Sequence, residues 1–129
     1  SNCAHIVRAV LEAIAFQTYD VIRAMEADFG KSIVQLKVDG GASANNFIMQ
    51  FQADLLNISV LRPQEIETTA LGVAYLAGLA VGYWKDKQEL IQNTTVGRIF
   101  QGAMSKEERE LKLNQWHRAV QRARSWEAE

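Results

Sequence analysis

The start of the chain carries the pattern of an amphipathic helix. Apolar residues recur at helical spacing from position 4 to 29, and charged residues lie mostly elsewhere around the helix. Gly30 follows at a position where helices commonly end in a left-handed residue. The pattern predicts one long helix over residues 4–29, whose apolar face comprises Ile6, Ala9, Val10, Ala13, Ile14, Val21 and Met25.

Two short strands flank a second helix. Apolar and polar residues alternate over 33–38, and helical spacing of apolar residues returns over 47–55. Residues 58–61 are again apolar and β-branched until Pro63, the only proline, ends the run. Short links between strand, helix and strand are typical of a right-handed parallel crossover. We therefore predict a helix-dominated α/β fold that contains a parallel strand–helix–strand unit.

Capping residues indicate where the later helices begin and end. Ser43 is the predicted N-cap of the second helix, and Asn57 closes it. A small-residue helix over 70–84, capped by a threonine, is too short and too rich in glycine to span a membrane, so we predict that it is buried. Ser105 begins the last helix with a capping-box pattern, and this helix runs to about Ser125.

A glycine pair stands between the first strand and the second helix, where parallel α/β sheets bind ligands. Gly40 and Gly41 lack a Cβ, so a flat ring or a phosphate can approach the backbone. The helix N-terminus favours an electron-rich ligand, and the amides of Asn45 and Asn46 can donate to or accept from a base or ribose. From spacing alone a tight turn without a ligand is the favoured alternative, because no dinucleotide or phosphate-loop fingerprint is present. Asp39 is expected to fix the loop.

Composition narrows the classes of function. At 129 residues the chain is one domain or part of one, and its net charge of −1 gives no electrostatic footprint for nucleic acid or a membrane surface. The single cysteine, Cys3, excludes an internal disulfide and fits a reducing compartment. His5, His117 and Cys3 lack the spacing of metal ligands, so we assign no metal site and expect structural roles for both histidines.

Two segments carry a resemblance to a known family: VDGGASANNFIMQFQADLL (38–56) and RPQEIETTALGVAYLAGLAVGYW (62–84). They resemble the carboxyl-terminal domain of the glycerol kinases, a branch of the FGGY family of carbohydrate kinases. Residues 4–18 and 116–127 resemble further helices of that domain. The resemblance implies that residues 1–129 are the C-terminal part of the second carbohydrate-kinase domain, within a ribonuclease-H-like, actin-like ATPase fold.

The same resemblance implies a role for the glycine loop. Gly41 would contact ATP or ADP through its backbone, Gly40 would make room for the nucleotide, and Asn45 would hydrogen-bond the adenosine. The helix over 67–82 would cross near the hinge between the two kinase domains. The implied reaction is the Mg²⁺-dependent transfer of the γ-phosphate of ATP to glycerol in the cytoplasm, giving glycerol 3-phosphate.

No position of the chain matches the family's catalytic base, its glycerol-binding residues, its first phosphate loop or its magnesium site. We therefore name no catalytic residue and predict that the chain alone is inactive, because phosphoryl transfer needs all of these groups together. Two alternatives stay open: another sugar or polyol kinase of the same family, or a non-catalytic interaction module. Two strands alone are marginal, so we expect either helix packing around them or self-association through the sheet edge.

Overall fold

The computed structural model describes residues 1–124, and its elements follow the predicted order. Three of them were not predicted: the 3-10 turn η1, the helix α4 and the strand β3. In chain order the elements are α1 (Cys3–Phe29), β1 (Gln35–Lys37), η1 (Gly41–Ala44), α2 (Asn46–Leu56), β2 (Ser59–Pro63), α3 (Thr68–Ala80), α4 (Lys87–Asn93), β3 (Val96–Phe100) and α5 (Lys106–Ala123).

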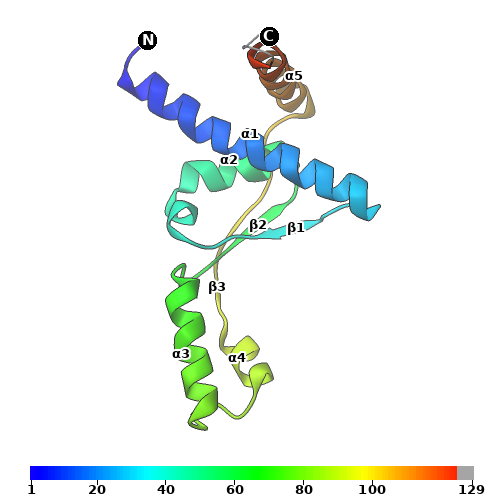
Figure 1. Cartoon of the computed structure of the whole chain (residues 1–129). Helices are drawn as coiled ribbons and strands as arrows, with labels where there is room; N and C mark the ends of the chain where they lie inside the picture. Colours follow the sequence, from blue (N-terminus) through cyan, green and yellow to red (C-terminus); the bar gives the residue numbers. More distant parts are fainter. Residues whose placement is uncertain (125–129) are drawn as a thin grey trace, which may run out of the picture.

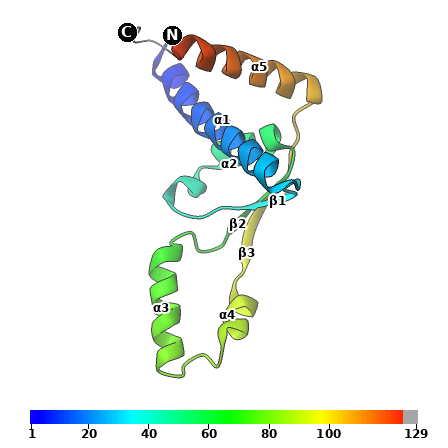
Figure 2. The same ribbon diagram turned by 45° about the vertical axis from the view of Figure 1, so that its right-hand side comes forward.

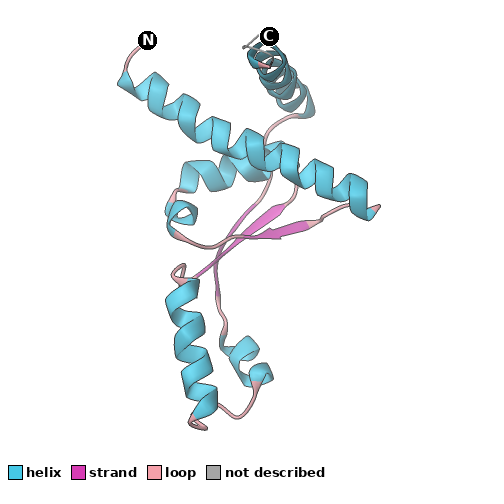
Figure 3. Cartoon of the chain, viewed as in Figure 1, coloured by secondary structure: helices cyan, strands magenta, loops and turns pink. Residues whose placement is uncertain are grey.

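The strands form a three-stranded mixed sheet in the order β1-β2-β3 (Figure 3). Strands β1 and β2 are parallel, with Leu36 opposite Val60, and α2 connects them. This confirms the predicted strand–helix–strand unit and the helix-dominated α/β class, although β1 is shorter than expected. Strand β3 pairs antiparallel with β2 and places Phe100 opposite Val60.

Strand β3 was not predicted, because its sequence does not alternate regularly between apolar and polar residues. Four of its five residues are exposed, and only Phe100 is buried. It also contains Gly97, a residue that weakens strands in general. Here the glycine is required, because a Cβ at Gly97 would lie 2.8 Å from the Cα of Gln64 and 2.9 Å from the carbonyl oxygen of Pro63. The two backbones approach closely at the irregularity between Arg62 and Pro63.

Helix α2 is the centre of the packing, as the views in Figures 1 and 2 make clear. One side of α2 contributes Ile48 and Ala53 to a buried cluster with the sheet residues Val60 and Phe100. Its other side packs against α1 and α5 through residues such as Phe51. Because seven of its eleven residues are buried, α2 forms a middle layer between the sheet and the outer helices.

Helix α1 has the predicted length and ends at Gly30, which has the expected left-handed φ of 68°. The predicted apolar face was wrong, however. Ile6, Val10, Ile14, Val21 and Met25 are exposed within the described chain. The buried residues are Ala15, Phe16 and Ile22. Phe16 decides the orientation, because its ring meets Phe51 edge-on at 5.4 Å and stacks on Trp116 at 5.1 Å.

Helix α5 begins at the predicted cap, Ser105, whose side chain accepts a hydrogen bond from the backbone N–H of Glu108. It is attached to α1 by a shared carboxylate. Trp116 Nε1 donates to Asp20 Oδ2 at 2.8 Å, and His117 Nε2 lies 3.1 Å from Asp20 Oδ1. His117 therefore has a structural contact, in agreement with the sequence interpretation.

Helix α3 was predicted to be buried, and this prediction was wrong. Within the described chain only Gly78 of this helix is buried, whereas Val73 and Leu76 are more than half exposed. The helix is apolar on all sides, so its composition alone does not tell which side meets a neighbour. Figure 1 shows α3 and α4 side by side beyond the sheet, away from α1, α2 and α5.

The ends of α3 also differ from the prediction. Glu67 occupies the N-cap position and makes no side-chain cap hydrogen bond, while Thr68 is already helical. The helix ends at Ala80 instead of Trp84, because the chain turns back so that the backbone N–H of Tyr83 donates to the carbonyl oxygen of Gly78 at 2.7 Å. Over residues 1–124, no helix combines the length and the hydrophobicity that crossing a bilayer would need.

Candidate functional site

The glycine loop leaves β1 and turns sharply before α2. Gly40 has a φ of 79°, a conformation that glycine adopts without steric cost, and Gly41 opens the 3-10 turn η1. Ser43 closes this turn on Gly40: its backbone N–H and its hydroxyl both donate to the Gly40 carbonyl oxygen, at 3.0 and 2.6 Å. Sequence and local hydrogen bonds together therefore define one compact turn.

Asn45, not Ser43, is the N-cap of α2, which corrects the sequence prediction. The side-chain oxygen Oδ1 of Asn45 accepts a hydrogen bond from the backbone N–H of Ile48 at 3.1 Å. The hydroxyl of Ser43 is buried and committed to Gly40. The 3-10 turn takes up the residues between the glycine pair and the helix, so the cap lies two positions later than the pattern indicated.

The backbone of the glycine pair is open to its surroundings. Among the described residues, no atom lies within 4 Å of the position that a Cβ would take at Gly40 or Gly41. Gly41 is exposed, and Gly40 and Asn45 are half-buried. The structure thus brings the three predicted site residues together on one loop, and it leaves space beside the two glycines for a flat or anionic group.

The loop is tied to the start of α3. The hydroxyl of Thr68 donates to Asp39 Oδ2 at 2.8 Å, and the backbone N–H of Gly40 donates to the carbonyl oxygen of Ile66 at 2.9 Å. Asp39 therefore fixes the loop, as the sequence analysis expected. An open hollow of about 420 Å³ lies on this side of the loop, with Asp39, Thr68 and Thr94 in its wall.

A second tie comes from the neighbouring strand. Arg62 of β2 extends its guanidinium to the junction between η1 and α2. Its Nη1 lies 2.9 Å from the carbonyl oxygen of Ser43, 3.2 Å from that of Ala44 and 2.8 Å from Asn46 Oδ1. The loop is therefore held from two sides, by Arg62 and by the Asp39–Thr68 pair.

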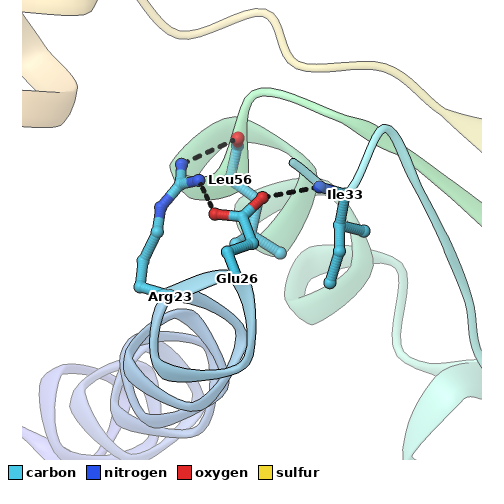
Figure 4. A network of polar contacts seen from close by, with 4 residues as sticks. All are labelled: Arg23, Glu26, Ile33 and Leu56. Carbon is cyan, nitrogen blue, oxygen red and sulfur yellow. Dashed lines mark hydrogen bonds and ion pairs between the residues drawn. The ribbon is translucent and has the colours of Figure 1, made fainter. Parts of the chain in front are cut away.

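The entry to β1 is fixed by a polar network near the end of α1 (Figure 4). Glu26 accepts a hydrogen bond from the backbone N–H of Ile33 at 2.7 Å and pairs with Arg23, which also donates to the carbonyl oxygen of Leu56 at 3.4 Å. The Ile33 N–H, and then the Arg23 guanidinium, lower the pKa of Glu26 below its ordinary value. The strand that leads into the glycine loop is thus positioned from α1.

Arg62 and Thr68 were not predicted as parts of this site. A signal existed for Arg62, since it is the one charged residue of β2 (Ser59–Pro63). Thr68 was read as part of a helix start, and nothing in its local sequence indicated a partner 29 positions earlier. Both contacts depend on strands and helices that meet only in the folded chain.

Residues 1–81 match the C-terminal domain of the FGGY family of carbohydrate kinases. Over 123 residues the chain is 58% identical to glycerol kinase 1 of Clostridium tetani. The aligned residues make up 95% of this chain and 25% of that protein. It is also 58% identical to the glycerol kinase of Carboxydothermus hydrogenoformans over 129 residues, or 100% of this chain and 26% of that protein.

Solved structures of a glycerol kinase and a xylulose kinase share the fold of this chain. The crystal structure of Plasmodium falciparum glycerol kinase with ADP aligns with a TM-score of 0.76 at 34% identity, over 92% of this chain and 24% of that one. A ligand-bound xylulose kinase from Lactobacillus acidophilus aligns with a TM-score of 0.68 at 24% identity, over 95% of this chain and 25% of that one. These neighbours are kinases of the actin-like ATPase fold, as the sequence predicted. The chain spans about a quarter of the length of its relatives.

Proposed function

This chain belongs to the FGGY family of carbohydrate kinases, and on that premise we propose that it is the C-terminal part of the second domain of a glycerol kinase. In this proposal it carries the adenosine side of the ATP site, in a cytoplasmic enzyme that transfers the γ-phosphate of ATP to glycerol. The observation that carries the proposal is the open space beside the Gly40–Gly41 backbone at the end of a parallel strand. Its support is the 58% identity to glycerol kinases.

Each residue of the loop has a distinct proposed role. Gly40 supplies the positive φ that turns the chain, and its missing Cβ makes room for the nucleotide. Gly41 offers its exposed backbone to the adenosine. Asn45 uses one lone pair of its side-chain oxygen to cap α2, and its amide NH₂ carries two further donors. In the proposal these donors hydrogen-bond acceptor atoms of the purine or ribose.

In this proposal Mg²⁺ binds mainly through parts of the intact protein other than the described residues 1–124. Over residues 1–124, no group of three histidine, cysteine or carboxylate side chains converges as a metal site would require. Asp39, next to the glycine pair, accepts a hydrogen bond from Thr68. Mg²⁺ commonly takes one or two carboxylates together with phosphate oxygens and water. The proposed Mg²⁺ and the acceptor glycerol therefore need ligands from other parts of the intact protein, and so does any catalytic base. We also propose that the chain self-associates through an edge of its sheet.

The decisive experiment fills the space beside the glycine pair. In the intact protein, Gly41→Leu places a side chain where the nucleotide would lie, so the Kd for ADP should rise roughly tenfold or more, a loss of about 1.4 kcal/mol per tenfold change. Calorimetry with ADP measures this loss. The Kd for glycerol should stay unchanged, because the acceptor does not bind at the loop.

Ala119→Leu, on the exposed surface of α5, serves as the matched control and should leave both affinities unchanged. Wild-type affinity for ADP in Gly41→Leu would refute the assignment of the loop. A panel of polyols and sugars tested as phosphate acceptors for the intact protein distinguishes glycerol from the substrates of other kinases in the family. Absence of ADP binding by the wild-type intact protein would favour a non-catalytic interaction module instead.

A further inference from the structure

We infer that Arg62 is a positioning residue for the glycine loop. From β2 it holds the junction between η1 and α2, and it thereby keeps the backbone of Gly41 exposed and preorganised for a nucleotide. The consequence for nucleotide affinity rests on the proposed function. The ordering of the loop does not, and it can be measured without any ligand.

The junction needs an external donor because the helical hydrogen-bond pattern is interrupted there. Between η1 and α2, Asn45 is extended, with φ of −78° and ψ of 107°. Its side chain takes the N–H of Ile48, the group that would otherwise donate to the carbonyl oxygen of Ala44 in a continuous helix. Carbonyl groups at such breaks require partners from outside the helix. Arg62 Nη1 lies within hydrogen-bond distance of the oxygens of both Ser43 and Ala44.

Arg62 is itself held in place. Its guanidinium lies over the ring of Phe100, 5.1 Å from the centroid, and Phe100 is almost completely buried in the sheet core. Asn46 Oδ1, in the first turn of α2, accepts from the same nitrogen at 2.8 Å. Arg98, directly opposite on β3, lies over the same ring at 4.4 Å.

The geometry requires arginine rather than any cation. A guanidinium is planar, so it can lie over an aromatic ring while its edge donates to several oxygens. A lysine ammonium is a compact point charge, and it cannot make the ring contact and span the junction in the same way. Arg62→Lys should therefore keep the charge but lose part of the ordering, whereas Arg62→Met keeps the apolar stem and loses all three hydrogen bonds.

Two measurements on the intact protein test this inference. Hydrogen–deuterium exchange of the amides over residues 41–48 should be faster in Arg62→Met by about tenfold or more, because hydrogen bonds to a charged group are stronger than those between neutral groups. The KM for ATP and the Kd for ADP should rise by about five- to tenfold, since a disordered loop must be ordered again on binding. The KM for the acceptor alcohol should stay unchanged. A general loss of stability would lower the amount of active enzyme and leave both KM values unchanged, so a rise in the KM for ATP alone distinguishes the positioning role.

Arg98→Met is the matched control, because Arg98 has the same charge and lies over the same ring from the partner strand. It should leave loop exchange and the KM for ATP within about twofold of wild type, a change of 0.4 kcal/mol or less. If Arg62→Met does not fold, Arg62→Lys replaces it and should show the same effects at smaller size. Unchanged exchange in the Arg62 variants, or an equal effect in Arg98→Met, would overturn the inference. If wild type fails to bind ADP, the proposed function fails, while the exchange comparison still decides the role of Arg62.

Discussion

Gly97 of β3 lies beside the register shift between Arg62 and Pro63 of β2. At this point a single methyl group decides whether the backbone of β3 fits against that of Pro63 and Gln64. A Cβ at Gly97 would lie 2.8 Å from two backbone atoms of Gln64. Backbone cannot move aside as the end of a flexible side chain can. Glycine is thus required at Gly97 by the close approach of another segment, whereas at Gly40 it is required by a positive φ.

Replacement of Gly97 tests this residue-scale argument. Gly97→Ala should lower the free energy of unfolding by about 1–3 kcal/mol, the usual cost of overpacking. Urea denaturation measures the change. Gly72→Ala is the control, since no described atom lies within 4 Å of the new Cβ and alanine is favoured over glycine inside a helix by about 0.5–1 kcal/mol. Equal destabilisation by both substitutions would contradict the close-approach explanation.

At the scale of elements, the link between α1 and β1 depends on one carboxylate. Glu26 joins the last turns of α1 to Ile33 just before β1, and Arg23 joins the same point to the end of α2. The hydrogen bond from the Ile33 N–H and the pairing with Arg23 lower the pKa of Glu26 in the folded protein. The folded state therefore binds this proton less readily than the unfolded state.

The lowered pKa of Glu26 predicts a defined dependence of stability on pH. The stabilisation is complete above the ordinary pKa of 4.5 and is lost as the pH falls through the lower folded value. Glu26→Gln should flatten the decline of unfolding free energy between neutral pH and about pH 3. Denaturation at several pH values measures this slope. Glu110→Gln, at an exposed pair with Lys106, should leave the slope unchanged; an acid dependence in Glu26→Gln equal to that of wild type would refute the argument.

At the scale of the whole molecule, the chain has one well-packed region and large uncovered apolar surfaces. The buried clusters connect α1, α2, α5 and the sheet, whereas apolar residues along α1 and α3 stay exposed within the described chain. Exposed apolar area on this scale is characteristic of surfaces that contact other protein. The chain also covers only a quarter of the length of its kinase relatives.

This incompleteness predicts that the 129-residue chain alone gives no turnover. Phosphoryl transfer requires nucleotide, metal and acceptor to be positioned together, and in the proposed function the described residues supply only the adenosine side of the site, at the loop of Gly40 and Gly41. A coupled assay with glycerol, ATP and Mg²⁺ measures the activity, and the intact protein under the same conditions is the positive control. Turnover by the chain above the background rate would contradict the prediction.

Local sequence was sufficient for much of the fold. The long first helix, its end at Gly30 and the end of α2 at Asn57 follow from patterns within a few residues. The parallel pairing of β1 and β2 follows from the order strand, helix, strand with short links. The glycine loop was also located correctly, since its position between a strand and a helix is itself a local property. Asn45 was expected to contact a ligand, but its role as the cap of α2 was assigned to Ser43, because the 3-10 turn was not recognised.

The sequence by itself determined the presence of α1, β1, α2, β2, α3 and α5 and where the chain turns sharply, because these follow from side-chain spacing, capping groups and the conformational freedom of glycine. Only the tertiary structure decided which face of α1 is buried, that α3 is exposed, that β3 joins the sheet, and that Arg62 and Thr68 hold the loop. The physical reason is common to all four: each depends on whether a segment distant in sequence packs against the element. A helix or strand with apolar residues on several sides does not reveal which side, if any, such a segment covers.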